Sequence, residues 1–262
     1  GNLYLDELHS SSKKQKSSSD IPFLNRFGVV GDLAATEIKL IIRNKRSKSA
    51  VIKSFIFILY GLLFYTNPKM AGQTTFFAPI FCGMLMTGIF IINYGQFMFG
   101  WQSSHFDGLL ANKINTEDFF RSKFLLFTLF SSINLILSLP YVYFGWRILL
   151  MHTVMYLWNL GVNATLVLYF ANRNFKSIDL SKSASFNWQG VGASQWILSI
   201  PLLLGPFVLF LPLHWMGFEN LAIASIGIVG LGFIITRKFW ISTLTNNFNN
   251  NRYLIAEGFR NK

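Results

Sequence analysis

Residues 76–99 have the sequence FFAPIFCGMLMTGIFIINYGQFMF, which contains no charged side chain. An apolar helix of about 20 residues spans a bilayer core of about 30 Å, so this stretch is long enough to cross a membrane. The rest of the chain agrees, since 52% of its 262 residues are hydrophobic and only 13% are charged. Soluble domains carry about 25% charged residues. The sequence therefore predicts an all-α, polytopic membrane protein.

Further stretches are similarly apolar, and together they predict about six transmembrane helices. The predicted spans cover residues 51–65, 76–99, 124–146, 148–171, 196–213 and 221–236. Proline removes a backbone donor and bends or breaks a helix, which membrane helices tolerate when neighbours satisfy the freed carbonyls. We expect kinks or breaks in the third and fifth spans, and the fifth is either transmembrane or re-entrant. The prolines concerned are Pro140, Pro201, Pro206 and Pro212.

The basic residues predict the orientation, because Lys and Arg near span ends favour the cytoplasm. With a cytoplasmic N-terminus, only Lys69 and Arg147 of the 23 basic residues lie outside. The reverse topology would place nearly all of them outside. We therefore expect both termini and the loops 100–123 and 172–195 to be cytoplasmic. The net charge of +12 is then an orientation signal, and no nucleic-acid partner is expected.

The composition divides the chain into four regions. Residues 1–27 are a polar, serine-rich linker, residues 28–49 an interfacial amphipathic helix, residues 50–240 the six-span domain and residues 241–262 a cytoplasmic tail. The chain begins with Gly1 and has no signal-peptide pattern. We expect it to be a piece of a longer protein.

Side chains that support catalysis or metal binding do not cluster in the sequence. There is no Gly-rich phosphate loop of Walker type, Cys82 is alone, and the four histidines lack metal-ligand spacing. We expect no enzyme activity, cofactor or metal in this chain. No Asp or Glu lies within a predicted span, so no buried carboxylate is expected in the membrane and an ion-coupled carrier is disfavoured.

Neutral polar residues do occur in the predicted spans. We expect them to form hydrogen bonds between helices, with a polar lining for a substrate path as the alternative. They include Asn93, Gln96, Asn134, Asn159 and Asn163.

The segment 28–49 predicts a helix with one apolar face and one basic stripe. Such a helix lies in the membrane interface with its cations toward anionic headgroups. It is either a membrane-surface anchor alone or also a docking surface for a partner. The basic residues assigned to the membrane surface are Lys39, Arg43, Lys45 and Arg46.

A short helix is predicted between the second and third spans. Ser104-His105-Phe106-Asp107 is similar to a capping box, and apolar residues follow Phe106 at i+3 and i+4. Asn115 is predicted to cap the helix that leads into the third span. The short helix either rests on headgroups or couples the membrane domain to a cytoplasmic ATPase. The candidate coupling residues are Ser104, His105, Phe106, Asp107, Leu109 and Leu110.

The loop between the fourth and fifth spans contains exposed aromatic residues in a Gly-rich setting. Phe186, Asn187 and Trp188 are expected to anchor this loop at the membrane interface, with a second partner contact as the alternative.

Three stretches carry a resemblance to a known family: residues 37–47, 94–108 and 253–260. With the order of surface helix, two spans, short helix and four further spans, they resemble the permease subunit of type-2 ABC exporters. They resemble more closely an uncharacterised family of bacterial ABC-permease-like proteins. The resemblance covers the chain from about Gly28.

This resemblance implies a function and partners. Members of the closer family are about twice as long, so the chain looks like a C-terminal half, and the other half or a second permease copy would complete it. It would lie in the bacterial cytoplasmic membrane, contact lipid and bind a separate cytoplasmic ABC ATPase. In the broader class the helix corresponding to residues 103–113 transmits force from the ATPase. The alternative function is a non-transporting membrane scaffold or assembly factor, and a secondary carrier ranks third.

Overall fold

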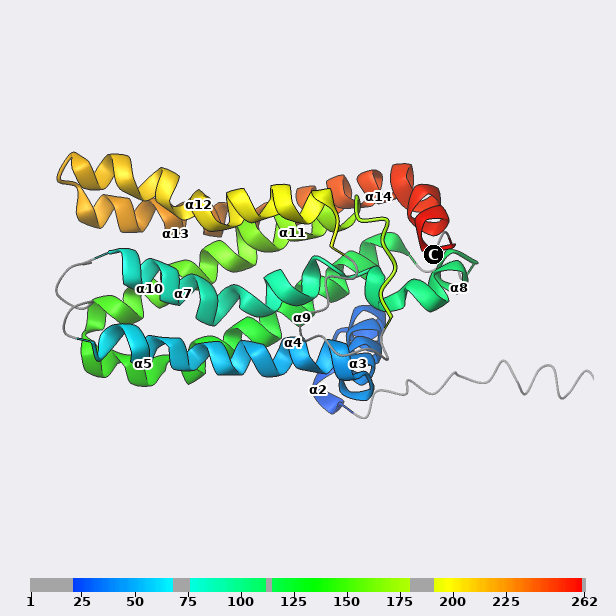
Figure 1. Cartoon of the computed structure of the whole chain (residues 1–262), viewed down its shortest axis with the longest axis horizontal. Coiled ribbons are helices and arrows are strands. Elements are labelled where there is room, and N and C mark those ends of the chain that lie inside the picture. Colours follow the sequence, from blue (N-terminus) through cyan, green and yellow to red (C-terminus); the bar gives the residue numbers. More distant parts are fainter. Residues whose placement is uncertain (1–20, 68–75, 112–114, 180–190, 261–262) are drawn as a thin grey trace, which may run out of the picture.

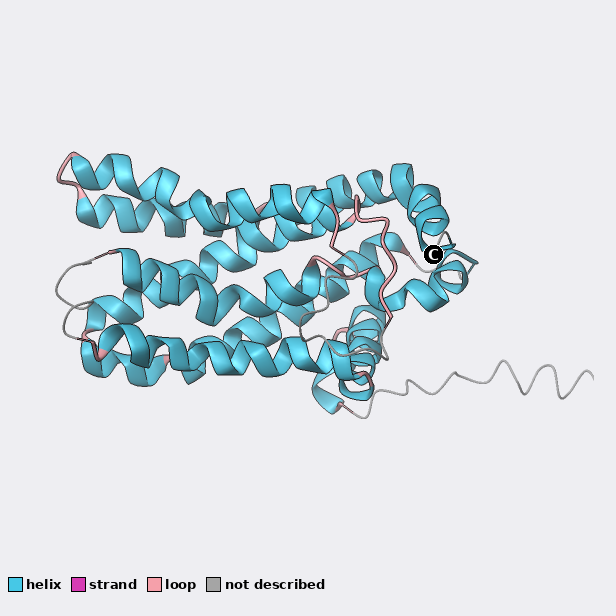
Figure 2. Ribbon diagram, viewed as in Figure 1, coloured by secondary structure: helices cyan, strands magenta, loops and turns pink. Residues whose placement is uncertain are grey.

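The computed structural model describes residues 21–67, 76–111, 115–179 and 191–260. These residues form helices, and no strand occurs among them (Figures 1 and 2). Long helices run side by side along the longest axis of the molecule (Figure 1). The fold is all-α, as the sequence predicts.

The membrane-spanning part begins at Lys45, after two N-terminal helices. The first elements are α2 (Pro22–Asn25), α3 (Gly28–Arg43), α4 (Lys45–Ile56), η1 (Phe57–Leu59) and α5 (Tyr60–Tyr65). The second span and the short helix after it comprise α7 (Phe77–Phe90), η2 (Ile91–Gly95), η3 (Gly100–His105) and α8 (Phe106–Ala111). The remaining elements are α9 (Thr116–Leu137), η4 (Leu139–Phe144), α10 (Trp146–Trp158), η5 (Asn159–Asn163), α11 (Ala164–Ala171), α12 (Ala193–Trp215), α13 (Glu219–Ile235) and α14 (Arg237–Arg260).

Five helical segments are long and apolar enough to cross a membrane. They are Lys45–Tyr65, Phe77–Ser103, Thr116–Leu137, Trp146–Ala171 and Ala193–Trp215. A sixth span is formed if α13 and α14, which meet at an angle of 66°, count as one broken span. The protein is therefore a multi-pass membrane protein with five or six spans.

The third span lies nearer the N-terminus than predicted. We expected residues 124–146, but α9 begins at Thr116 because the Asn115 side chain accepts a hydrogen bond of 3.0 Å from the Glu117 N–H. The predicted Asn115 cap is thus confirmed. Pro140 lies beyond the span, in the 3-10 helix η4.

The fifth span is one continuous helix that is long and apolar enough to cross a membrane, so the break expected at its prolines does not occur. Pro201, Pro206 and Pro212 all lie inside α12. Each proline removes only one backbone donor, and more than a full turn separates each from the next. The intervening residues keep the helix intact.

The predicted helix over residues 28–49 is two helices. Asn44 separates α3 from α4 with an extended backbone (φ −105°, ψ 127°). Its side-chain Nδ2 donates a hydrogen bond of 2.8 Å to the Leu40 carbonyl. This local bond offers the chain an alternative to continuing the helix. The first span consequently begins at Lys45.

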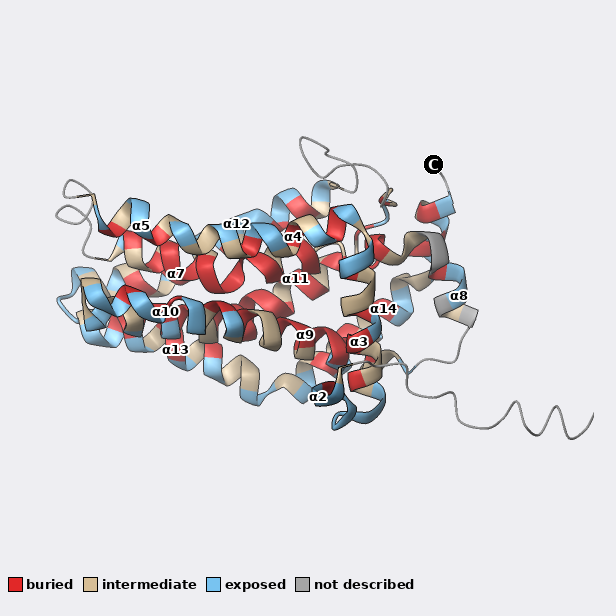
Figure 3. Cartoon of the chain, turned by 90° about the horizontal axis from the view of Figure 1, so that it is seen from below, coloured by how far each residue is buried: buried red, intermediate tan, exposed pale blue. Residues whose placement is uncertain are grey.

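The outer faces of the bundle are apolar. Only 28% of the most apolar window of Lys45–Tyr65 and of Ala193–Trp215 is buried, against 72% for Trp146–Ala171 (Figure 3). On α12 the exposed side chains include Trp196, Ile200, Leu204 and Val208. This exposure fits contact with lipid, since a hydrophobic helix of this length is stable in a bilayer.

Glycine allows the central helices to approach closely. A Cβ at Gly161 would lie 2.2 Å from the carbonyl oxygen of Gly230, and a Cβ at Gly230 would lie 2.6 Å from the backbone of Leu157. Small residues of this kind let membrane helices pack backbone to backbone. They place α13 directly against α10 and η5.

Candidate functional site at the α8 end of the bundle

The short helix α8 lies at the same end of the bundle as α3 and the last turns of α14 (Figure 1). We call this region the α8 end. It brings together segments that are about 150 residues apart in the sequence, because Arg260 of α14 contacts Asp107 of α8. Most of the predicted site residues belong to this end.

A groove of about 510 Å³ opens between α8 and α14. Its lining combines apolar side chains with both signs of charge. The lining residues are Asp107, Leu110, Arg252, Tyr253, Ala256, Glu257 and Arg260. A surface with an apolar part and a charged rim is typical of a protein-binding site.

Two of the lining residues form an exposed ion pair. The Arg260 guanidinium donates two hydrogen bonds to the Asp107 carboxylate, of 2.7 Å from Nη2 and 3.2 Å from Nε. The two side chains are 67% and 61% exposed. Exposed ion pairs contribute little to stability, so this contact can rearrange when another molecule binds.

Phe106 does not line the groove. We expected it to enter a partner, but it is only 1% exposed and lies within the chain's own core. Its ring packs edge-to-face on Phe99 (5.7 Å between centroids) and Phe259 (5.1 Å), and it also contacts Phe248. The expectation that Phe106 is a free anchor is wrong, because α14 folds back over α8 and covers it.

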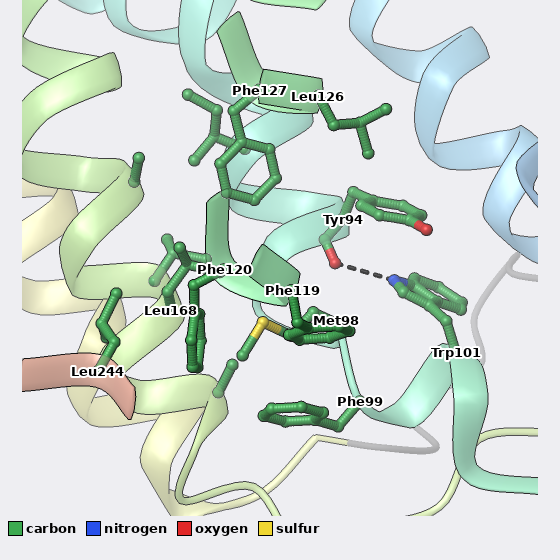
Figure 4. Close-up of a cluster of buried hydrophobic side chains, with 14 of the residues drawn as sticks. Tyr94, Met98, Phe99, Trp101, Phe119, Phe120, Leu126, Phe127, Leu168 and Leu244 are labelled. Carbon is green, nitrogen blue, oxygen red and sulfur yellow. Dashed lines mark hydrogen bonds between the residues drawn. The ribbon is translucent and has the colours of Figure 1, made fainter. Parts of the chain in front are cut away.

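The aromatic core beneath α8 connects the second and third spans to α14. Phe99 stacks on Phe119 at 5.5 Å and on Phe248 at 4.9 Å. Figure 4 shows Phe99, Phe119 and Phe120 gathered around Met98. Aromatic pairs of this geometry add stability beyond the area that they bury. The core fixes the position of α8 relative to the membrane domain.

The other predicted coupling residues have different positions. Asp107 and Leu110 line the groove. Ser104 and His105 end the 3-10 helix η3, and Leu109 lies within α8. The side chains of those three residues are outside the described part of the structure. The second-loop residues Phe186, Asn187 and Trp188 also lie outside the described residues.

The four basic residues assigned to the membrane surface do not share one face. Arg43 and Lys45 are exposed and Lys39 is half-buried. Arg46 is only 5% exposed and lies in the field of the Asp179 carboxylate. Its assignment to the membrane surface is wrong, because the break at Asn44 places Arg46 in α4, on the side that faces the protein.

A buried polar network joins α3 to the second and third spans. The Glu37 carboxylate accepts hydrogen bonds from the Tyr94 hydroxyl and from Gln102 Nε2, the latter at 3.0 Å. The Lys123 ammonium lies 2.5 Å from Glu37 Oε2 and 4.6 Å from the centre of the Phe119 ring. Glu37 is 5% exposed and Lys123 1%. Glu37 is thus a buried carboxylate of the surface helix α3, which lies outside the predicted spans.

The sequence contains a signal for this network that composition alone does not reveal. Glu37 follows Ala34 by three residues and precedes Ile41 by four, so it falls on the buried face of α3. Lys123 likewise lies among the phenylalanines of α9. A lone charge on an apolar face predicts an opposite charge nearby, because an unpaired buried charge is costly. Only the tertiary structure identifies which charge pairs with which.

A second buried polar cluster lies between α7 and η5. Asn159 Nδ2 donates to Thr87 Oγ1 (2.8 Å) and to the Met84 carbonyl (3.1 Å), and Asn163 Nδ2 donates to Asn159 Oδ1 (2.6 Å). The predicted hydrogen bonding between helices is confirmed for Asn159. Asn134 is also buried, but its amide has no partner among the described residues.

Titratable groups that could bind a metal do not gather in the described residues. His152 Nε2 lies 2.8 Å from the Tyr65 hydroxyl within the membrane-spanning region. Within residues 21–67, 76–111, 115–179 and 191–260, no three His, Cys, Asp or Glu side chains are close enough to hold a metal ion. The groove and the Glu37 network are therefore the features on which a function can be based.

Comparisons with other proteins give one match. No curated protein matches the chain, and no solved structure does. The model of one protein family, described as a family of unknown function (DUF5687), matches residues 1–262. Because this match covers the whole sequence, the chain belongs to the DUF5687 family of unknown function.

Proposed function

We propose that this chain is the membrane-spanning permease subunit of an ATP-driven, ABC-type exporter. A separate cytoplasmic subunit hydrolyses ATP, and the substrate is unidentified. The α8 end faces the cytoplasm of a bacterial cell, in agreement with the distribution of basic residues. A second copy of the permease, or a further half of the same chain, completes the translocation unit.

The groove between α8 and α14 is the observation that carries this proposal. A helix between two spans can transmit force only if it is held rigidly to the membrane domain. The aromatic core under α8 supports this condition, since Phe106 packs on Phe99 of the second span and on Phe259 of α14. The groove beside it offers Leu110 and Tyr253 to a partner, with charged side chains around them.

The Glu37 network favours transport driven by a separate ATPase over transport driven by a proton or ion gradient. A carrier driven by protons or ions needs an ionisable group that is free to bind them. The Glu37 carboxylate is already bonded to Tyr94, Gln102 and Lys123. A carboxylate engaged in this way is poorly suited to binding and releasing an ion during each transport cycle.

The test is co-purification of the protein, in detergent, with an ATPase encoded by a neighbouring gene and carrying a Walker-type loop. We compare the wild type with Leu110→Ala and Tyr253→Ala, and measure ATPase rates in liposomes. Leu254→Ala is the matched control, because Leu254 is exposed on the same helix but does not line the groove. Loss of one anchor at an interface hot spot costs about 2 kcal/mol, which is roughly a thirtyfold loss of affinity.

The outcomes distinguish an ATPase-coupled permease from a membrane scaffold or assembly factor. Retention of the ATPase by the wild type and Leu254→Ala, with loss in Leu110→Ala and Tyr253→Ala, supports docking in the groove. Equal retention in all four proteins removes the groove from the interface. If the wild type neither retains nor stimulates any ATPase, a membrane scaffold or assembly factor becomes the better interpretation.

A further inference from the structure

The surface helix α3 packs on the bundle through a face made mostly of small residues. Its buried positions include Gly31, Ala34, Ala35 and Ile41. Apolar stabilisation grows with the side-chain area that is removed from water. Three of these four residues have little or no side chain, so the apolar contact of this helix of 16 residues depends mainly on Ile41 and on the partly buried Ile38 and Leu40.

A polar network also links α3 to the bundle. Glu37 lies at the centre of the buried face, and donors from two spans surround its carboxylate. Tyr94 and Gln102 come from the second span, and Lys123 comes from the third. Tyr94 is completely buried and belongs to the π-helical turn η2, a local irregularity often found at functional sites.

The backbone provides a hinge directly after α3. Asn44 adopts an extended conformation between two helices, so a change at this one residue would reorient α3 without disturbing α4. α3 also carries the exposed apolar side chains Val29 and Ile42, each 63% exposed. These side chains can remain in contact with lipid when the helix moves.

We propose that α3 rotates as a unit about Asn44 and is held against the bundle by the Glu37–Lys123 ion pair, which we call the latch. Opening of the latch releases α3 as a unit onto the membrane surface. The latch is also connected to the end of the second span, because Gln102 donates a hydrogen bond to Glu37 and lies in η3, immediately before α8. A movement of α8 would therefore shift Gln102 and change its hydrogen bond to Glu37. This inference goes beyond the proposed function and stands whether or not an ATPase binds in the groove.

The test measures the reactivity of single thiols toward a small, water-soluble maleimide on the purified full chain. Ala35→Cys places a thiol on the latched face of α3, where Ala35 is 1% exposed. Native Cys82, buried in the second span, reports global unfolding in the same molecule. Peptide mass analysis distinguishes the two sites. The latch is opened by Glu37→Gln or by Lys123→Met.

We expect the thiol introduced by Ala35→Cys to react on the order of 100-fold faster in both latch variants, while Cys82 stays protected. Arg121→Met is the matched control, because it removes an exposed ion pair with Glu117 on the same helix as Lys123. This control substitution should leave the reaction rates of both thiols unchanged. A thiol introduced by Ala50→Cys, beyond the hinge, should remain protected in the latch variants.

Three results would overturn the inference. Unchanged protection at position 35 in both variants would mean that apolar packing alone holds α3. Simultaneous exposure of Cys82 would mean that the ion pair supports the whole bundle and is no latch. Exposure at position 50 together with position 35 would place the moving boundary beyond Asn44.

Discussion

Replacing Phe106 by alanine should loosen the α8 end of the bundle and lower the stability of the protein. Phe106 is buried by α14 and contacts three other phenylalanine rings. The substitution removes the ring but leaves its neighbours Phe99, Phe248 and Phe259 around a space that they cannot fill completely. The variant therefore tests whether α14 folds back over α8.

The expected magnitude follows from the burial of the side chain. Truncation of a fully buried phenylalanine costs about 3–5 kcal/mol, which includes the lost transfer free energy and the cavity. For a protein of this size, each kcal/mol lowers the unfolding midpoint by about 2–4 °C. We therefore expect the thermal midpoint of Phe106→Ala to fall by roughly 6–20 °C.

The chain contains its own reporter for this measurement. Cys82 is the single cysteine and is buried in the second span. A thiol-reactive fluorophore added to the detergent-solubilised protein reacts with it only when the bundle opens. The fluorescence increase during heating gives the unfolding midpoint without an introduced cysteine.

Phe239→Ala is the matched control. Phe239 belongs to the same helix α14 but is 63% exposed, so its truncation should shift the midpoint by less than about 2 °C. If Phe106→Ala shifts the midpoint no more than this control, Phe106 is not enclosed by α14. The groove would then lack the rigid support on which the proposed function depends.

Gly230→Ala should lower the thermal midpoint in the same thiol assay, because its Cβ would meet the backbone of α10 at 2.6 Å. Gly232→Ala, two residues along α13, has no atom within 4 Å of its Cβ and should instead stabilise the helix by up to about 1 kcal/mol; shifts of the same sign would contradict the close packing of α13. Asn159→Leu should cost about 1–3 kcal/mol, because it leaves buried polar partners unsatisfied, and an unchanged midpoint would exclude this. A thiol introduced by Tyr143→Cys, at an 88% exposed position, should react with an impermeant reagent on intact cells, whereas one introduced by Asn249→Cys should react only after lysis. The opposite labelling would reverse the proposed orientation.

Much of the membrane domain could be predicted from the sequence. The span 76–99 differs from the observed Phe77–Ser103 mainly by an extension at its C-terminal end. The Asn115 cap was also predictable, since short polar side chains at helix starts bond to the next backbone N–H groups. These features depend on local hydrophobicity and local hydrogen bonding, which neighbouring residues determine.

Proline and asparagine were harder to interpret from the sequence. Pro201, Pro206 and Pro212 suggested a broken fifth span, yet α12 is continuous. The sequence pattern around Asn44 did not predict a break, yet this residue separates the surface helix from the first span. The outcome at such residues depends on whether the surrounding structure favours bending, which a single sequence does not reveal.

The sequence by itself determined that this is an all-α membrane protein and approximately where its spans lie. It also determined that the basic residues favour one side of the membrane. Only the tertiary structure decided what each apolar face contacts. Lipid chains are as apolar as leucine, so a hydrophobic position can face lipid, another span or a partner with the same composition. For this reason Phe106 could be taken for an exposed anchor although it is covered by α14. Glu37 and Lys123, which are 86 positions apart, become partners only because the fold brings α3 against α9.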